Sequence, residues 1–159
     1  MSKKYYLESY KWTTENFEEM EWHDCKIHAI AFDSIKNRFL LDIDYILKWV
    51  GPNENGYYSF WISPATLIFE NVYDFKIDIN YGLETILENI KRFNERKPNN
   101  SDYINENIEW EWMIETRNGE ISFKSVGYSQ YFRSNPVYKE QQEFTIDERG
   151  GFSFSTEIN

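Results

Sequence analysis

The fold of this chain is decided by one stretch with a two-residue period, Arg38-Phe39-Leu40-Leu41-Asp42-Ile43-Asp44-Tyr45-Ile46-Leu47-Lys48-Trp49. Its odd-numbered positions are all apolar or aromatic, and two of its even-numbered positions are aspartates. Because successive side chains of a strand point to opposite faces of a sheet, this pattern predicts a long strand. One face of that strand is expected in the core, and the acidic face is expected in water.

Further strands are predicted on both sides of this stretch, and short turns join most of them. The expected ranges are 27–32, 57–62, 65–72, 75–79, 108–114, 120–126, 139–147 and 152–157. Residues 51–56 and Asn118-Gly119 have the composition of turns, and the second pair is typical of a hairpin. Pro64 is expected at an edge or a bulge, because proline has no backbone N–H to donate.

The spacing changes between residues 83 and 95, where Leu83, Ile86, Leu87 and Ile90 recur at intervals of three and four. This spacing predicts one helix. Strands joined by short turns favour antiparallel pairing. The predicted fold class is therefore mainly β (α+β): an antiparallel twisted sheet, built as a sandwich or a partly open barrel, with one helix near residues 83–95. The length of 159 residues predicts a single domain over 1–159.

The composition combines 19% aromatic residues with a formal net charge of −10. A field of this sign repels phosphate backbones and anionic lipid headgroups and attracts basic proteins. We therefore expect neither nucleic acid nor a membrane as a partner. One cysteine allows no disulfide within the chain, and the first residues lack the apolar run of a secretory signal, so the cytoplasm is the expected compartment. The oligomeric state stays open.

Both histidines and the only cysteine lie in the stretch from Trp22 to His28. Such residues bind metals, but on an extended strand His23 and Cys25 face one side while Asp24 and His28 face the other. A thiol nucleophile also needs a base and an orienting group, and the sequence shows no such arrangement. We predict no metal, no cofactor and no catalytic residue here. His23 and Asp24 are expected to bind the backbone, and Cys25 to act as a small apolar side chain.

Paired acids on the predicted strands allow several interpretations. Asp42 and Asp44 share one strand face, as do Glu109, Glu111 and Glu115. Carboxylates about 6.5–7 Å apart along a strand lie in the range that glycosidases use. The alternation places these acids opposite the apolar face, which favours solvation first, a surface for a basic partner second and catalysis third. The pair Trp110 and Trp112, at the same period, is expected in the core.

A resemblance is carried by the stretch Phe17-Glu18-Glu19-Met20-Glu21-Trp22-His23-Asp24-Cys25-Lys26-Ile27. It resembles the aromatic-His-Asp opening of small bacterial proteins of unknown function, and the hairpin from residue 32 to 49 fits the same likeness. Some of these proteins resemble immunity proteins of bacterial toxin systems, which block a toxin by binding it. The resemblance covers residues 17–79. It implies a binding function with a toxin-like partner and implies no catalytic residues.

The leading functional hypothesis is a non-enzymatic cytoplasmic protein that binds a basic protein partner through an acidic sheet face. The residues predicted to bind the partner are Asp42, Asp44, Asp78, Glu109, Glu111 and Glu115. The alternative is a small-ligand or carbohydrate-binding β module, or a weak hydrolase, with an aromatic-lined pocket. A third hypothesis is a structural subunit whose exposed aromatic side chains mediate self-association.

Overall fold

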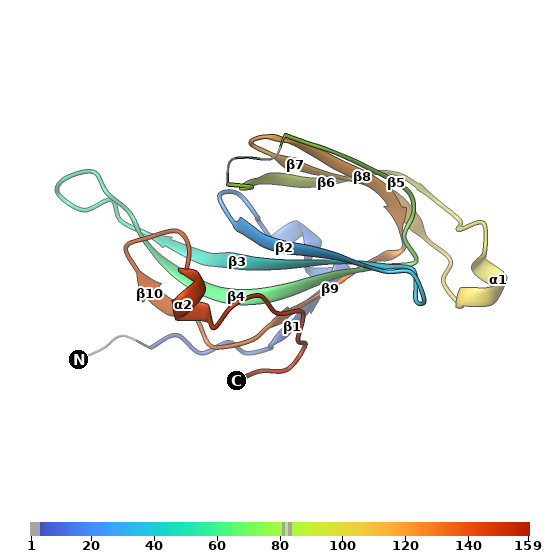
Figure 1. The fold of residues 1–159 in the computed structure, drawn as a ribbon. Coiled ribbons are helices and arrows are strands. Elements are labelled where there is room, and N and C mark those ends of the chain that lie inside the picture. Colours follow the sequence, from blue (N-terminus) through green and yellow to red (C-terminus); the bar gives the residue numbers. More distant parts are fainter. Residues whose placement is uncertain (1–3, 81, 83) are drawn as a thin grey trace.

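The computed structural model describes residues 4–80, 82 and 84–159, which form two antiparallel sheets packed face to face (Figure 1). The strands are β1 (Lys11–Thr13), β2 (Lys26–Asp33), β3 (Arg38–Val50), β4 (Ser59–Glu70), β5 (Tyr73–Ile79), β6 (Leu87–Arg96), β7 (Glu109–Thr116), β8 (Gly119–Ser125), β9 (Gly127–Phe132) and β10 (Val137–Lys139). The helices are η1 (Thr14–Glu19), α1 (Ser101–Ile104) and α2 (Ile146–Arg149). None of the described helices is long and apolar enough to cross a membrane.

The two sheets differ in how their strands are ordered. Sheet A has the order β1-β9-β4-β3-β2, with β10 beside one end of β4, and sheet B has the order β5-β8-β7-β6. The predicted mainly β, antiparallel fold is confirmed, and it takes the form of a sandwich. Sheet B covers the inner face of sheet A, while the C-terminal residues run along the outer face (Figure 1).

The core lies between the sheets and contains the apolar face of β3. Phe39, Leu41 and Ile43 are fully buried, as the alternation predicts. Across the sandwich, the ring centroid of Trp112 on β7 lies 5.2 Å from that of Phe69 on β4. A buried aromatic side chain removes about 150–250 Å² from water, so these rings supply much of the hydrophobic stabilisation. The prediction that Trp112 belongs to the core is confirmed.

In the range 83–95, predicted to be a helix, residues 87–95 instead belong to strand β6 at an edge of sheet B. The register of β6 against β7 shifts between Leu87 and Asn89, as it does at a β-bulge. The extra residue places Leu87 and Ile90 on the same, buried side although they are three residues apart. The bulge thus reproduces on a strand the spacing that is typical of a helix, and the helix prediction is wrong. Leu83 lies outside the described residues.

The C-terminal residues form less strand than predicted. In the range 139–147 the strand β10 ends at Lys139 and helix α2 begins at Ile146, and residues 152–157 have no regular secondary structure. Contacts from side chains hold this segment instead: Thr66 Oγ1 on β4 donates to the carbonyl oxygen of Ser155 at 2.7 Å. The strand predictions for 139–147 and 152–157 are therefore wrong beyond β10. The segment crosses the outer face of sheet A and is not a strand of either sheet.

Pro64 and Gly119, predicted to interrupt a strand and to form a turn, each have a clear structural role. Pro64 lies within β4 where its neighbour changes from β9, which pairs from Ala65 onward, to β10, which pairs up to Ile62. No backbone donor is required from Pro64 at this junction. Gly119 follows the turn between β7 and β8 with a φ of +150°, and a Cβ there would overlap the carbonyl oxygen of Asp78. Only glycine fits that position without strain.

Candidate functional site

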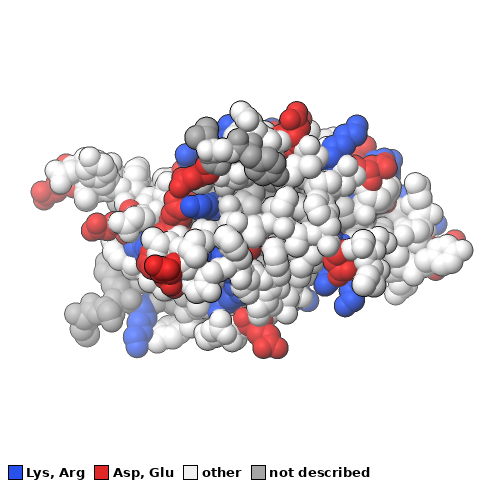
Figure 2. Space-filling model, viewed as in Figure 1, with Lys and Arg blue, Asp and Glu red and all other residues white. Residues whose placement is uncertain are grey.

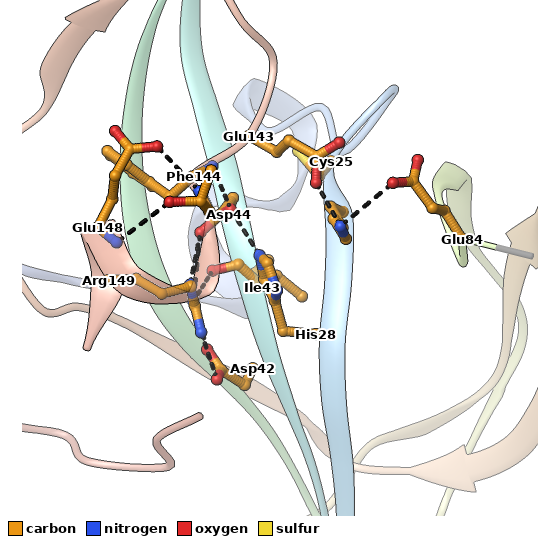
Figure 3. Close-up of polar contacts among 12 residues, drawn as sticks. Cys25, His28, Asp42, Ile43, Asp44, Glu84, Glu143, Phe144, Glu148 and Arg149 are labelled. Atoms are coloured by element: carbon orange, nitrogen blue, oxygen red, sulfur yellow. Dashed lines mark hydrogen bonds and ion pairs between the residues drawn. The ribbon is translucent and has the colours of Figure 1, made fainter. Parts of the chain in front are cut away.

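A buried cluster of charged side chains lies between β3 and α2, on the outer face of sheet A (Figure 3). The Arg149 guanidinium donates Nη1 to Asp42 Oδ2 and Nη2 to Asp42 Oδ1, both at 2.7 Å. Its Nε donates to Asp44 Oδ1 at 3.2 Å. All three side chains are completely buried. A two-pronged contact of this kind is the geometry in which arginine binds a carboxylate most strongly.

Two further side chains complete the cluster. Arg133, which follows β9, donates Nη2 to Asp42 Oδ1 at 2.7 Å and is 5% exposed. His28 on β2 places its Nε2 2.6 Å from Asp44 Oδ2. The cluster therefore joins β2, β3, the end of β9 and α2. We call it the buried clamp and define it by Asp42, Asp44, His28, Arg133 and Arg149.

The buried clamp holds the C-terminal segment against sheet A. The backbone N–H of Phe144 donates to Asp44 Oδ2, and that of Ser153 donates to Asp42 Oδ2, each at 2.8 Å. Burial acts to raise the pKa of Asp42, but hydrogen bonds from Arg149 and Ser153 outweigh burial, so the pKa lies below its usual value. Asp42 is therefore ionised at neutral pH, and its charge is used inside the protein.

The predicted acidic sheet face is not built as expected. Asp42 and Asp44, predicted to be solvated, are completely buried, and that prediction is wrong. Glu109 on β7 is buried as well, with its Oε2 accepting from Arg96 Nε at 2.9 Å and from the Tyr73 hydroxyl. Alternation along a strand separates two faces, but it does not reveal that the polar face is covered by another part of the same chain.

The other three predicted partner-binding residues lie on sheet B. Asp78 on β5 is exposed, while Glu111 and Glu115 on β7 are half-buried. Lys91 on β6 places its Nζ 2.7 Å from Glu115 Oε1. Because Asp42 and Asp44 belong to sheet A, the six acids do not form one surface. A role of Asp78, Glu111 and Glu115 in partner binding stays a prediction.

A groove of about 1070 Å³ lies beside the buried clamp, between the start of β2, the β3–β4 hairpin and residues 139–148. One of its walls is aromatic. The ring centroid of Trp49 lies 5.0 Å from that of Phe60 and 5.6 Å from that of Tyr58. Trp49 and Tyr58 keep 39% and 43% of their surface exposed, so their rings are available to a ligand. We call this hollow the acidic groove, for the charges of its other wall.

The charged wall of the acidic groove carries four glutamates and two lysines, namely Glu84, Glu140, Glu143, Glu148, Lys26 and Lys139. Lys26 pairs with Glu143, and its Nζ also lies 3.4 Å from Glu84. Burial acts to lower the pKa of Lys26, but the hydrogen bond that Lys26 donates to Glu143, together with the charges of Glu143 and Glu84, outweighs burial and raises that pKa. Figure 2 shows acidic side chains gathered on the part of the surface that holds the β3–β4 hairpin and α2. The groove is therefore formally negative.

The side chains of the motif from Trp22 to His28 contact different parts of the chain. Cys25 is completely buried, its Sγ accepts from the backbone N–H of Ile46 at 3.4 Å, and burial raises the pKa of the thiol to about 12. Asp24 accepts from Arg117 Nη2 at 2.5 Å. Within the described residues, no group of three His, Cys, Asp or Glu side chains could hold a metal ion. This motif anchors the start of β2.

The sequence-based prediction missed the acidic groove because its walls come from distant segments. Trp49 and Tyr58 belong to the β3–β4 hairpin, whereas Glu140 and Glu143 follow β10. Two signals were present in the sequence. Tyr57 and Tyr58 come directly after a turn, where two adjacent aromatic side chains cannot both be buried easily, and residues 140–143 are too polar for the strand predicted there.

Comparison of the chain with protein-family models, with curated proteins and with solved structures finds no match. No residue role is therefore carried over from another protein. The function has to be inferred from the acidic groove and the buried clamp, and the likeness of residues 17–79 to immunity proteins stays a prediction.

Proposed function

We propose that this protein acts by binding, and that its acidic groove receives a basic segment of a partner protein. The observation that supports this most strongly is the presence of four glutamates and of exposed Trp49 and Tyr58 in one groove. Carboxylates pair with ammonium and guanidinium groups, and the faces of Trp and Tyr attract the same cations. The net charge of −10 adds a long-range field that speeds association with a basic protein.

The buried clamp favours binding because it positions one wall of the groove in advance. Asp44 accepts from the backbone of Phe144, and Arg149 at the end of α2 contacts both aspartates. Residues between these two anchors include Glu148, and Glu143 directly precedes them. A surface that is already ordered loses less conformational freedom when it binds. The clamp thus supports a binding role by holding residues of the groove wall in place.

The specific form of the proposal is an immunity protein that blocks a basic toxin in the bacterial cytoplasm. It rests on the resemblance of residues 17–79 to such proteins, a stretch that includes the β3–β4 hairpin with Trp49 and Tyr58. The single, buried Cys25 suits a reducing compartment, because it neither forms a disulfide within the chain nor exposes a thiol.

The test is the binding of a fluorescein-labelled oligolysine peptide to the full chain, measured by fluorescence anisotropy at several salt concentrations. The double variant Glu140→Gln/Glu143→Gln should weaken binding about 2- to 30-fold, because exposed ion pairs contribute about 0.2–1 kcal/mol each. Added salt should weaken binding by the unmodified chain, because it screens these charges.

A matched control separates the effect of net charge on the affinity from the effect of where the charge lies. The double variant Glu88→Gln/Glu120→Gln removes the same charge from exposed positions on sheet B, and it should change the affinity by less than about twofold. Equal weakening by the two double variants would mean that only the net charge of the protein matters. That result would refute the groove as the binding site.

A second candidate function, the binding of a neutral carbohydrate, is favoured by the aromatic wall of the groove. Aromatic side chains with a few polar groups around them are typical of small-ligand sites. Titration with a neutral oligosaccharide, followed by the heat of binding, should then be insensitive to salt and to Glu140→Gln. Trp49→Ala should abolish the signal, whereas Tyr103→Ala, at an aromatic residue that is 91% exposed and outside the groove, should not.

A further inference from the structure

One end of β3 forms an open edge of sheet A. On one side, β3 pairs with β4 as far as Val50, but on the other side its pairing with β2 ends at Asp44 and Lys26. The β3–β4 hairpin therefore projects beyond β2 (Figure 1). Among the described residues, no strand pairs with residues 47–50 on the β2 side.

The chain before β2 turns away from this edge and does not continue along it. The backbone N–H of Cys25 donates to the carbonyl oxygen of Trp22, and the carbonyl oxygen of Cys25 accepts from the N–H of Leu87. The Cys25 Sγ accepts a hydrogen bond from the N–H of Ile46. From Leu47 onward the edge of β3 is open, and an open edge is a template for a further strand.

Two hollows lie on opposite faces of this open edge and meet at Trp49. The acidic groove lies on the outer face, where the C-terminal segment covers sheet A. A second hollow of about 650 Å³ lies on the inner face and is lined by Tyr45, which packs in the core, and by Glu19 and Glu21. His23 stacks on Trp49 with ring centroids 6.3 Å apart.

Both hollows carry more acids than bases. The second hollow is lined by two glutamates, Glu19 and Glu21, both of which are exposed. Apart from the imidazole of His23, its basic side chain is that of Lys48. The acidic groove has four glutamates against two lysines. Successive side chains of an extended segment point to opposite faces of a sheet. A strand added to this edge would therefore send alternate side chains into one acidic hollow and then the other.

We propose that a basic segment of the partner protein adds to sheet A as a strand along Leu47–Val50. The segment forms main-chain hydrogen bonds with the open edge of β3, and its lysine or arginine side chains enter the two hollows on either side of Trp49. Main-chain pairing supplies affinity in this mode of recognition, and the hollows supply specificity. This inference rests on the proposed function and specifies how the groove is used.

The test compares two peptides that have the same charge but different backbones. One is a labelled peptide with lysines at consecutive positions, so that successive lysine side chains point to opposite faces of the added strand. The other has the same sequence but is N-methylated on its central residues, which removes backbone donors and obstructs pairing. The unmodified peptide should bind at least about tenfold more tightly to the full chain, because several main-chain hydrogen bonds are lost on methylation. Hydrogen exchange of the backbone amides at residues 47–50 should slow when the unmodified peptide is bound.

Variants of the second hollow provide an independent readout. Glu19→Gln/Glu21→Gln should weaken binding of the unmodified peptide by a factor similar to that of Glu140→Gln/Glu143→Gln, whereas Glu88→Gln/Glu120→Gln should not. Equal affinity for the two peptides, or unchanged exchange at residues 47–50, would overturn strand addition. If Glu140→Gln/Glu143→Gln still weakened binding in that case, the proposed function would stand. Failure of both peptides to bind at millimolar concentration would overturn both proposals.

Discussion

Replacing Arg149 by methionine should lower the free energy of unfolding by about 3–5 kcal/mol, because it leaves buried carboxylates without their main partner. The guanidinium contacts Asp42 at 2.7 Å and Asp44 at 3.2 Å, and all three side chains are completely buried. Methionine fills most of the space but donates no hydrogen bond. Arg133 still pairs with Asp42, whereas Asp44 keeps His28 and the backbone N–H of Phe144.

Urea denaturation followed by tryptophan fluorescence measures this loss, and Arg38→Met is the matched control. Arg38 pairs with Asp33 at the surface, with 25% and 23% of the two side chains exposed, so its loss should cost at most about 1 kcal/mol. Hydrogen exchange of residues 140–155 separates local detachment of the segment from global unfolding. A cost of less than about 1 kcal/mol, with unchanged protection of that segment, would refute the role of the buried clamp.

Three further predictions concern pH, a turn and the cysteine. The pKa of Asp42 is lower in the folded than in the unfolded chain, so its contribution to stability is present above the unfolded pKa of about 4 and is lost as the pH falls below it. Urea midpoints should therefore decrease on acidification from about pH 5, and less steeply in Asp42→Asn. Gly119→Ala should lower the free energy of unfolding by about 1–3 kcal/mol, and by more than Gly56→Ala, where an added Cβ meets no atom within 4 Å. Cys25, with its pKa raised to about 12, should resist iodoacetamide in the native chain and react in urea, as followed by mass spectrometry.

The inner face of sheet A could be predicted from the sequence, whereas its outer face could not. Burial of Phe39, Leu41 and Ile43 follows from alternation alone, since apolar side chains on one face of a strand must be covered. The same alternation places Asp44 on the opposite face, but it does not predict whether water or protein covers that face. Its partner Arg149 lies 105 residues further along the chain, and no local pattern connects the two.

The helix predicted near residues 83–95 failed for a different physical reason. Leu87 and Ile90 are both buried, so the identification of a core-facing set was sound. The period was misleading, because one extra residue at a bulge converts the two-residue interval of a strand into three. Patterns that depend on period are least informative where a strand is irregular, and β6 has a second register shift near Phe93.

The buried clamp changes where the negative charge of this protein acts. Asp42 and Asp44 are matched inside the protein by Arg133 and Arg149, so they add little to the field that a partner meets. Their influence passes instead through the segment that they hold, which presents its glutamates to the acidic groove. Arg149→Met should therefore weaken binding of a basic peptide even though Arg149 is completely buried and cannot touch it. Arg38→Met removes the same charge from a surface pair and should leave that binding unchanged, which separates positioning of the groove wall from a change in net charge.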